Sequence, residues 1–373
     1  MSLNVIILAA GQGARMCSSL PKVLHPLAGK PLLEHVAATA KCLKANIHIV
    51  YGYGGNTVPA RLSHIKANWI EQIEQLGTGH AVAQAMPSVK DDEKVLVLYG
   101  DVPLISAATL QRLLKAADNA LGLLTMHQTN PTGYGRIMRD EQNRVLRIVE
   151  EKDASPAERQ VTEINTGILA VDAGRLRTWV NALENKNAQG EFYLTDIIAM
   201  AVRDGVTINT VSPDSALEVM GVNNKAQLAE LERHYQRAQA QQLMLQGVTL
   251  CDPARFDLRG ELTVGSDVFI DANVIIEGKV TLGNRVRLGP NVWIRNARIG
   301  DDVEIFSNCV IDDAAIEAGC KIGPFARIRP ETQLAEHVHI GNFVEVKKST
   351  VGVNSKINHL SYVGDTSVGK NVN

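Results

Sequence analysis

The sequence has few aromatic residues, no excess of either charge and no long run of apolar residues. Phe, Trp and Tyr make up 4% of the 373 residues, so the core has to be largely aliphatic. Lys and Arg total 38 and Asp and Glu total 40, which gives a net charge of −2. Nucleic-acid binding would need a basic patch, and a membrane helix would need roughly 18 successive apolar residues. We therefore expect neither a nucleic-acid nor a membrane partner.

The cysteine patterns of disulfide-rich and zinc-binding proteins are also missing. The five cysteines are an odd number and contain no CxxC pair, which is typical of reduced thiols in a cytosolic protein. The first eight residues are apolar without the basic segment that opens a signal peptide. We therefore expect a cytoplasmic protein of ordinary globular composition, with 45% hydrophobic and 21% charged residues.

Residues 1–223 alternate short apolar runs with segments of helical periodicity. Near-continuous apolar strands that alternate with helices predict an α/β domain, with a mostly parallel, Rossmann-like sheet covered by helices on both faces. The following stretch, 224–248, is rich in strong helix formers and predicts a long helical linker. Four of the apolar runs are read as strands, namely 4–8, 47–50, 95–98 and 121–126.

The remaining residues, 249–373, contain a repeat. From Val264 to Val368 aliphatic residues recur at 19 positions, separated by 14 intervals of six residues and four of five. Such a hexapeptide repeat predicts a parallel β-helix, in which each short strand directs one aliphatic side chain inward and neighbouring coils stack. Gly often follows the aliphatic residue, and we expect it to permit tight corners.

A Gly-rich turn, Leu8-Ala9-Ala10-Gly11-Gln12-Gly13, follows the first predicted strand. At the carboxyl edge of a parallel sheet, backbone N–H groups in such a turn converge on phosphates. Met16 stands where a dinucleotide fingerprint would have its third Gly, and no Gly-Lys-Ser/Thr of a P-loop follows, which argues against a nicotinamide dehydrogenase. Arg15 and Lys22 would neutralise a polyphosphate there, although such residues are usually solvated surface charges.

A second strand, ending Leu98-Tyr99-Gly100-Asp101, places a carboxylate at the same edge. Mg²⁺ binds few protein carboxylates together with substrate phosphates, so Asp101 is a candidate metal ligand. Position alone would equally allow Asp101 to stabilise a turn or cap a helix.

These motifs, together with Pro21-Lys22-Val23-Leu24, resemble those of the sugar-nucleotide pyrophosphorylases. Further segments resemble, more narrowly, the family of bifunctional N-acetylglucosamine-1-phosphate uridyltransferases / glucosamine-1-phosphate acetyltransferases. The resemblance runs from residue 4 to the last residue. The segments that narrow it are 74–80, 99–101, 132–136, 150–153, 163–167, 190–196 and 221–224.

The resemblance implies Mg²⁺-dependent uridylyl transfer from UTP to N-acetylglucosamine 1-phosphate, giving UDP-N-acetylglucosamine for peptidoglycan and lipopolysaccharide precursors. Attack of the sugar phosphate on the α-phosphorus needs charge stabilisation and alignment rather than a nucleophilic side chain. One departure is Ala14, where the family usually has Thr. The resemblance implies that the UTP phosphates are bound by Leu8, Ala9, Ala10, Gly11, Gly13, Arg15 and Lys22, and that uracil is bound by Gln72, Gly77 and Thr78. It implies further substrate contacts for Tyr99 and Gly100, and Mg²⁺ binding by Asp101 and Asn223. It also implies that N-acetylglucosamine is bound by Gly135, Glu150, Asn165 and Thr195.

For the repeat region the resemblance implies a left-handed β-helix, a homotrimer and acetyl-CoA-dependent acetylation of glucosamine 1-phosphate. A general base is needed because the substrate ammonium has to lose a proton before it attacks the thioester. The implied roles are sugar-phosphate contacts for Arg329 and Lys347, general base for His359, and sugar contacts for Tyr362 and Asn373. In the family further coils follow the position of Asn373 and carry the acetyl-CoA pocket, so we expect intact uridylyl transfer and weak or absent acetyl transfer.

Other interpretations stay open at this point. His337 and His339, two apart on a predicted strand, would share one face, but no third His at a repeat position completes a zinc site. Another sugar-1-phosphate nucleotidyltransferase is one alternative function, and a trimeric sugar-nucleotide-binding assembly without catalysis is another. The charged set Arg15, Lys22 and Asp101 favours an enzyme, because binding alone would not need all three.

Overall fold

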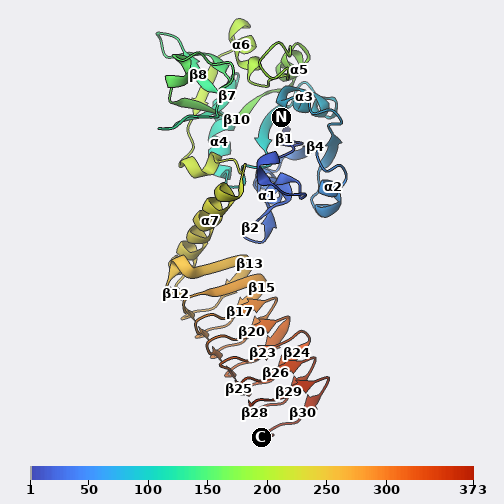
Figure 1. Ribbon diagram of the computed structural model, residues 1–373, viewed down its shortest axis with the longest axis vertical. Coiled ribbons are helices and arrows are strands. Elements are labelled where there is room, and N and C mark those ends of the chain that lie inside the picture. Colours follow the sequence, from blue (N-terminus) through green and yellow to red (C-terminus); the bar gives the residue numbers. More distant parts are fainter. Residues whose placement is uncertain (1) are drawn as a thin grey trace. The chain divides into compact units, whose positions relative to one another are not determined.

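The computed structural model describes residues 2–373, which form two compact units (Figure 1). The first contains the residues up to Pro26 and Pro31–Leu228, and the second contains Leu27–Lys30 and Ala229–Asn373. Helix α7 (Lys225–Leu245) starts in the first unit and continues in the second. No helix within residues 2–373 is long and apolar enough to cross a membrane. The boundaries at residues 223 and 248 stay a prediction.

The first unit is built on one sheet with the strand order β11-β7-β10-β6-β1-β4-β5. The pairs β1–β4, β1–β6, β4–β5 and β7–β11 are parallel, whereas β10 runs antiparallel to β6 and β7. The prediction of a mostly parallel, Rossmann-like sheet is therefore confirmed. The strands are β1 (Leu3–Ala9), β4 (Asn46–Tyr51), β5 (Asn68–Glu71), β6 (Lys94–Tyr99), β7 (Leu121–His127), β10 (Glu163–Asp172) and β11 (Ile208–Val211), with β8 (Arg136–Arg139) and β9 (Val145–Val149) as an antiparallel pair beside β10.

Helices cover both faces of this sheet. Successive side chains of a strand point to opposite faces, and in the buried strands both sets are apolar, so both faces pack against helices. In β1, Val5 and Ile7 pack into one core while Ile6 packs into the other, and all three are fully buried. The first core contains residues of α1 (Leu32–Cys42) and α4 (Ala107–Ala116). The second contains residues of α3 (Thr78–Ala85), α5 (Ala173–Asn181) and α6 (Asp196–Arg203). The small helix α2 spans Thr57–Arg61.

The second unit is a stack of coils made of short parallel strands. Each strand pairs with the strand 17 or 18 residues further along, as in the ladder Ile276, Ile294, Ile311 and Ile328. Three hexapeptides therefore make one coil, and their inward aliphatic residues form a continuous core. One sheet contains β12 (Thr249–Leu250), β14 (Phe269–Ile270), β16 (Arg287–Leu288), β19 (Glu304–Ile305), β22 (Lys321–Ile322), β25 (His339–Asn342) and β28 (Lys356–His359).

The other sheet of this unit divides into two rows beyond the long strands β13 (Phe256–Val264) and β15 (Val274–Leu282). One row contains β17 (Trp293–Arg295), β20 (Val310–Asp312), β23 (Arg327–Ile328), β26 (Glu345–Lys347) and β29 (Tyr362–Gly364). The other contains β18 (Arg298–Ile299), β21 (Ala314–Ile316), β24 (Thr332–Leu334), β27 (Thr350–Val351) and β30 (Ser367–Val368).

Glycine has a different role in the coils from the one we expected. Gly283 is not left-handed, but a Cβ on it would lie 2.4 Å from Oδ1 of Asp301 in the next coil. Residues such as Asn291 and Asn308 instead take the left-handed corner conformation, with φ of 59° and 60°, which Asn tolerates better than most residues. Repeat glycines such as Gly283 thus permit close approach of coils, whereas non-glycine residues, asparagine among them, turn many of the corners.

We predict that Ile311→Ala will destabilise the coiled unit strongly. The Ile311 side chain is fully buried between its ladder neighbours Ile294 and Ile328. Such a truncation removes buried apolar surface and leaves a cavity, which costs about 2–5 kcal/mol. Denaturant unfolding measures the loss, and Leu245→Ala is the control because the Leu245 side chain is 81% exposed. Equal unfolding midpoints for the two variants would contradict the assigned core.

Candidate active site

The main cleft of the first unit lies at the carboxyl ends of β1 and β6. These neighbouring parallel strands pair Leu8 with Tyr99, so the turn after β1 and the residues after β6 meet at one edge of the sheet. The cleft has a volume of about 620 Å³. It is lined by Leu8, Ala9, Ala10, Gly11, Gln12, Lys22, Val23, Gln72, Gln75, Gly77, Thr78, Ala81, Tyr99, Asp101 and Glu191.

The Gly-rich turn is shaped by a left-handed Gly13 with φ of 65°. A Cβ on Gly13 would lie 2.6 Å from Cβ of Lys22, so only glycine lets the turn approach this lysine. The short 3-10 helix Ala14–Met16 follows, and its buried Met16 anchors the turn to the core. Arg15, on the same helix, is exposed and is not among the cleft-lining residues.

Lys22 and Asp101, which line the cleft, converge with Asn223. The Lys22 ammonium forms an ion pair with the Asp101 carboxylate and lies 3.3 Å from Oδ1 of Asn223. The backbone reinforces this arrangement, because the N–H of Val222 donates to the carbonyl of Asp101 at 2.9 Å. Two side-chain oxygens thus face one cation, and oxygen ligands are the type that Mg²⁺ prefers. The residues therefore fit a hard divalent cation.

The far end of the cleft is formed by the segment after β5. Gln72 is buried, and its Nε2 donates to the carbonyl of Gly77 at 3.2 Å and lies 3.0 Å from Nδ1 of His80. Gly77 has φ of 108°, and a Cβ there would lie 2.7 Å from the carbonyl oxygen of Phe192. Thr78 accepts a hydrogen bond from the N–H of Leu194 at 3.1 Å. These contacts join Gln72 to Gly77, and they hold Gly77 and Thr78 against the segment that contains Phe192 and Leu194.

The four residues that the resemblance assigns to N-acetylglucosamine are joined by hydrogen bonds and close packing. Thr195 donates from Oγ1 to Glu150 at 2.9 Å, and the N–H of Asn165 donates to the carbonyl of Gly135 at 2.8 Å. A Cβ on Gly135 would lie 3.4 Å from both carboxylate oxygens of Glu150. None of the four is among the cleft-lining residues, but Gly167 packs against the Tyr99 ring that lines the cleft.

Burial sets the protonation behaviour of this region. Desolvation raises the pKa of the Glu150 carboxyl; the Thr195 hydrogen bond opposes the shift, and the neighbouring Asp196 and Asp153 add to it. Desolvation also raises the pKa of the Tyr99 phenol, with the nearby Glu150 carboxylate as a second cause. Tyr99 therefore stays a neutral hydroxyl, and the polar groups around it lie in a poorly hydrated environment.

Some residues of the cleft were not predicted. Gln12, Val23, Gln75, Ala81 and Glu191 line it, although no role was assigned to them. Gln12, Gln75 and Glu191 lie inside the motifs that carried the resemblance, so motif membership was the available indication. The ion pair between Lys22 and Asp101 was also missed, because it joins residues 79 positions apart in the sequence.

In the second unit the predicted acetyltransferase residues lie on the outer side of the last coils. Arg329 donates to Glu345 at 2.7 Å, and Nζ of Lys347 lies 3.9 Å from a carboxylate oxygen of Asp365. His359 pairs in register with Asn342, whereas Tyr362 pairs with Glu345 and is 62% exposed. Asn373 accepts a hydrogen bond from Asn358 at 3.0 Å.

One expectation for this unit is wrong. His337 takes a left-handed corner conformation with φ of 60°, and β25 begins only at His339. The two histidines therefore do not alternate along one strand, so the expected shared face does not form.

Two family models match parts of this chain. Residues 5–160 match the family model of the MobA-like NTP transferase domain, and residues 258–365 match that of the GMPPB C-terminal domain. A solved nucleotidyl transferase from Methanothermobacter thermautotroptrophicus is similar with a TM-score of 0.46 and 18% identity, covering 64% of this chain and 99% of its own. The first unit thus belongs to the nucleotidyltransferase class, on the strength of the family model and the sheet.

Two curated relatives identify a particular family within this class. Both have the name bifunctional protein GlmU, one from Methylococcus capsulatus and one from Marinobacter nauticus. Each is 58% identical to this chain over 100% of its residues and 82% of the relative's length. The chain belongs to the GlmU family. The resemblance found in the motifs is therefore confirmed, and with it the prediction of an enzyme with uridyltransferase activity in UDP-N-acetylglucosamine synthesis.

We predict that Glu150→Gln will stabilise the fold increasingly as the pH rises. A carboxyl with a pKa raised by folding binds more protons when folded, so stability falls as the pH increases through that window and stays lower above it. The amide has no such penalty, and each pKa unit corresponds to about 1.4 kcal/mol. Unfolding free energies between about pH 4 and pH 8 measure the difference. Glu184→Gln is the control, because the Glu184 side chain is 68% exposed. If the unfolding free energies of wild type and Glu150→Gln changed in parallel with pH, the raised pKa of the Glu150 carboxyl would be refuted.

Proposed function

We propose that the cleft binds UTP and N-acetylglucosamine 1-phosphate and transfers the uridylyl group to the sugar phosphate with release of pyrophosphate. The observation that carries this proposal is the convergence of Lys22, Asp101 and Asn223 beside a Gly-rich turn. Such a cluster supplies positive charge and metal ligands where phosphates would lie. A module that only bound sugar nucleotides would not need this combination.

The chain's own residues account for the main requirements of the reaction. The sugar phosphate oxygen attacks the α-phosphorus in line and pyrophosphate leaves, so the barrier depends on alignment and on stabilising negative charge. Backbone N–H groups of the Gly-rich turn would bind the phosphates, and Arg15 and Lys22 would neutralise them. Asp101 and Asn223 would hold Mg²⁺, which supplies further positive charge to the phosphate oxygens.

Substrate selection follows from the two other groups of residues. Gln72, Gly77 and Thr78 would bind uracil. The hydrogen bond from Gln72 to Gly77 and the one from Leu194 to Thr78 hold these residues in place. Glu150 and Thr195, with Gly135 and Asn165, would bind N-acetylglucosamine. A poorly hydrated Glu150 carboxylate is a strong acceptor for sugar hydroxyls, since hydrogen bonds to charged groups are worth more than neutral ones.

We further propose residues 1–223 as the uridyltransferase domain, 224–248 as a helical linker and 249–373 as part of a left-handed β-helix that forms a trimer in the cytoplasm. The stacked rings of Phe325 and Phe343, with centroids 5.1 Å apart and half their surface exposed, support an association surface. The second activity of the family, acetylation of glucosamine 1-phosphate by acetyl-CoA, is proposed to use Arg329, Lys347, His359, Tyr362 and Asn373.

We predict that Asp101→Asn will reduce pyrophosphate release from UTP and N-acetylglucosamine 1-phosphate by about 10²-fold or more, a loss typical of removing a preorganised charge-stabilising group. The assay is run with and without Mg²⁺. Asp118→Asn is the matched control, because Asp118 is exposed and pairs with Lys94 outside the cleft. A wild-type chain that released no pyrophosphate would favour the binding-module interpretation, and preference for dTTP or ATP would favour another nucleotidyltransferase.

We predict that Ala14→Thr will lower the KM for UTP a few-fold without changing kcat. Ala14 opens the short helix after the Gly-rich turn and is exposed, so a hydroxyl can be added there without entering the core. A typical hydrogen bond contributes about 0.5–1.5 kcal/mol net, which corresponds to a change in KM of about two- to tenfold. Steady-state kinetics at varied UTP measures the effect, with Ala14→Val as the isosteric control. An unchanged KM for Ala14→Thr would show that this position does not reach the nucleotide.

A further inference from the structure

We propose that Thr109 and Glu218 are positioning residues that hold Asp101 and Asn223 at the separation needed to bind the metal–UTP complex. The inference rests on the proposed function, because it assumes that Asp101 and Asn223 hold the metal. Neither Thr109 nor Glu218 lines the cleft, so both would act through the chain segments that they join.

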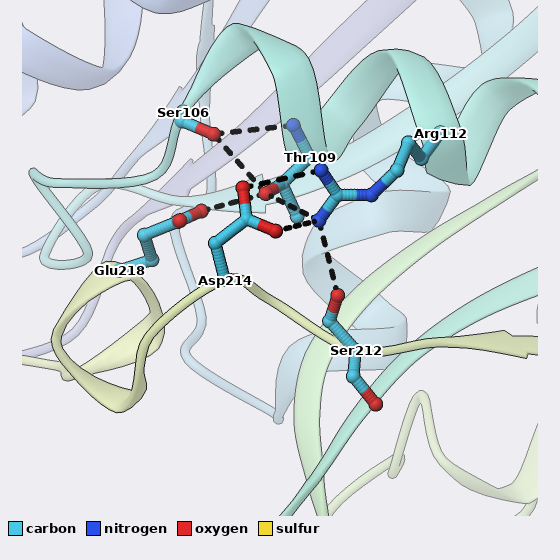
Figure 2. A network of polar contacts seen from close by, with 6 residues as sticks. All are labelled: Ser106, Thr109, Arg112, Ser212, Asp214 and Glu218. Carbon is cyan, nitrogen blue, oxygen red and sulfur yellow. Dashed lines mark hydrogen bonds and ion pairs between the residues drawn. The ribbon is translucent and has the colours of Figure 1, made fainter.

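The Thr109 hydroxyl is the centre of a polar network (Figure 2). It donates to Oε2 of Glu218 at 2.7 Å, and it accepts from the Ser106 hydroxyl at 3.1 Å and from the Arg112 guanidinium at 3.1 Å. A hydroxyl has one donor and two acceptor positions, so this one is fully used. Thr109 is also completely buried, which means that water cannot replace any partner that is lost.

The network joins the two segments that carry the candidate metal ligands. Asp101 is followed five residues later by Ser106, the N-cap of α4, which accepts from the N–H of Thr109 at 3.1 Å. Glu218 lies in the 3-10 helix Ala216–Val219 and precedes Asn223 by five residues. The Thr109–Glu218 hydrogen bond therefore ties the Asp101 segment to the Asn223 segment at their far ends.

A second tie point lies next to the ligands themselves. The N–H of Val222 donates to the carbonyl of Asp101 at 2.9 Å. One tie point alone would leave the two segments free to pivot, whereas two tie points close a ring and fix their relative position. Loss of the Thr109–Glu218 bond would leave this end held by the Arg112 contacts and by packing of Val219, and would loosen the segment that carries Asn223.

An ion pair supports the ring from its outer side. Arg112 binds both carboxylate oxygens of Asp214, at 2.8 and 3.2 Å, and donates to the carbonyl of Ser212 at 3.2 Å (Figure 2). Asp214 is 65% exposed, and exposed ion pairs contribute little. We therefore assign the main positioning role to the buried Thr109–Glu218 bond.

The test compares Thr109→Val, which has nearly the same shape but no hydroxyl, with Thr109→Ser, which retains it. Mn²⁺ binding in the presence of UTP is measured by electron paramagnetic resonance, together with the Mg²⁺ dependence of pyrophosphate release and thermal unfolding. We expect Thr109→Val to weaken Mn²⁺ binding about tenfold, as for loss of a hydrogen bond to a charged group, and Thr109→Ser to restore it. Thr178→Val is the control, since the Thr178 hydroxyl donates to the carbonyl of Gly174 within its own helix.

Separate outcomes distinguish this inference from the proposed function. Wild-type Mn²⁺ affinity in Thr109→Val, whether or not its melting temperature falls, would overturn the positioning role and leave the proposed function intact. If Thr109→Val does not fold, Glu218→Ala removes the same bond from the half-buried partner and is expected to weaken Mn²⁺ binding equally; unchanged binding would again overturn the inference. A wild-type chain that bound no Mn²⁺ with UTP would instead count against the proposed function, and the inference would fall with it.

Discussion

The parallel pairing of β1 with β6 is the constraint on which the candidate site depends. Both strands are buried, and a slip of one residue would turn every side chain to the opposite face of the sheet. The register that pairs Leu8 with Tyr99 is therefore fixed by the two cores rather than by the site. Because of this register, the Gly-rich turn and Asp101 emerge side by side, and Lys22 can reach the carboxylate.

Several features in and near the cleft lower the stability of the fold and are offset by the two apolar cores of the first unit. The Glu150 carboxyl is buried at a cost that appears in its raised pKa. Gly13 and Gly77 add conformational entropy to the unfolded chain, yet a Cβ at either position would collide with its neighbours.

Features that depend on a local sequence pattern, such as strands and repeats, could be predicted from the sequence. Contacts between residues far apart in the sequence could not. The strand before the Gly-rich turn follows from its apolar pattern and motif, and the hexapeptide repeat of the second unit follows from periodicity. The Thr109–Glu218 bond joins residues 109 positions apart, and no local pattern marks such a pair. For Arg15 the motif predicts a role that the structure does not reproduce. The motif implies that Arg15 binds phosphate, but its side chain is exposed and it is not among the cleft-lining residues.

The left-handed corners of the coils are occupied by residues whose identity the aliphatic core does not determine. Asn291 and Asn308 occupy successive left-handed corners, and Asn291 donates to Asn308 at 3.1 Å. Phe325 and Phe343 take the next two corners with φ of 55°, a conformation that costs a residue other than Gly or Asn roughly 1–2 kcal/mol. Their rings stack on each other but stay half exposed, so the aliphatic core does not offset this cost. Burial of these rings in the proposed trimer would offset the cost, which would explain phenylalanine at positions where asparagine turns the chain more easily.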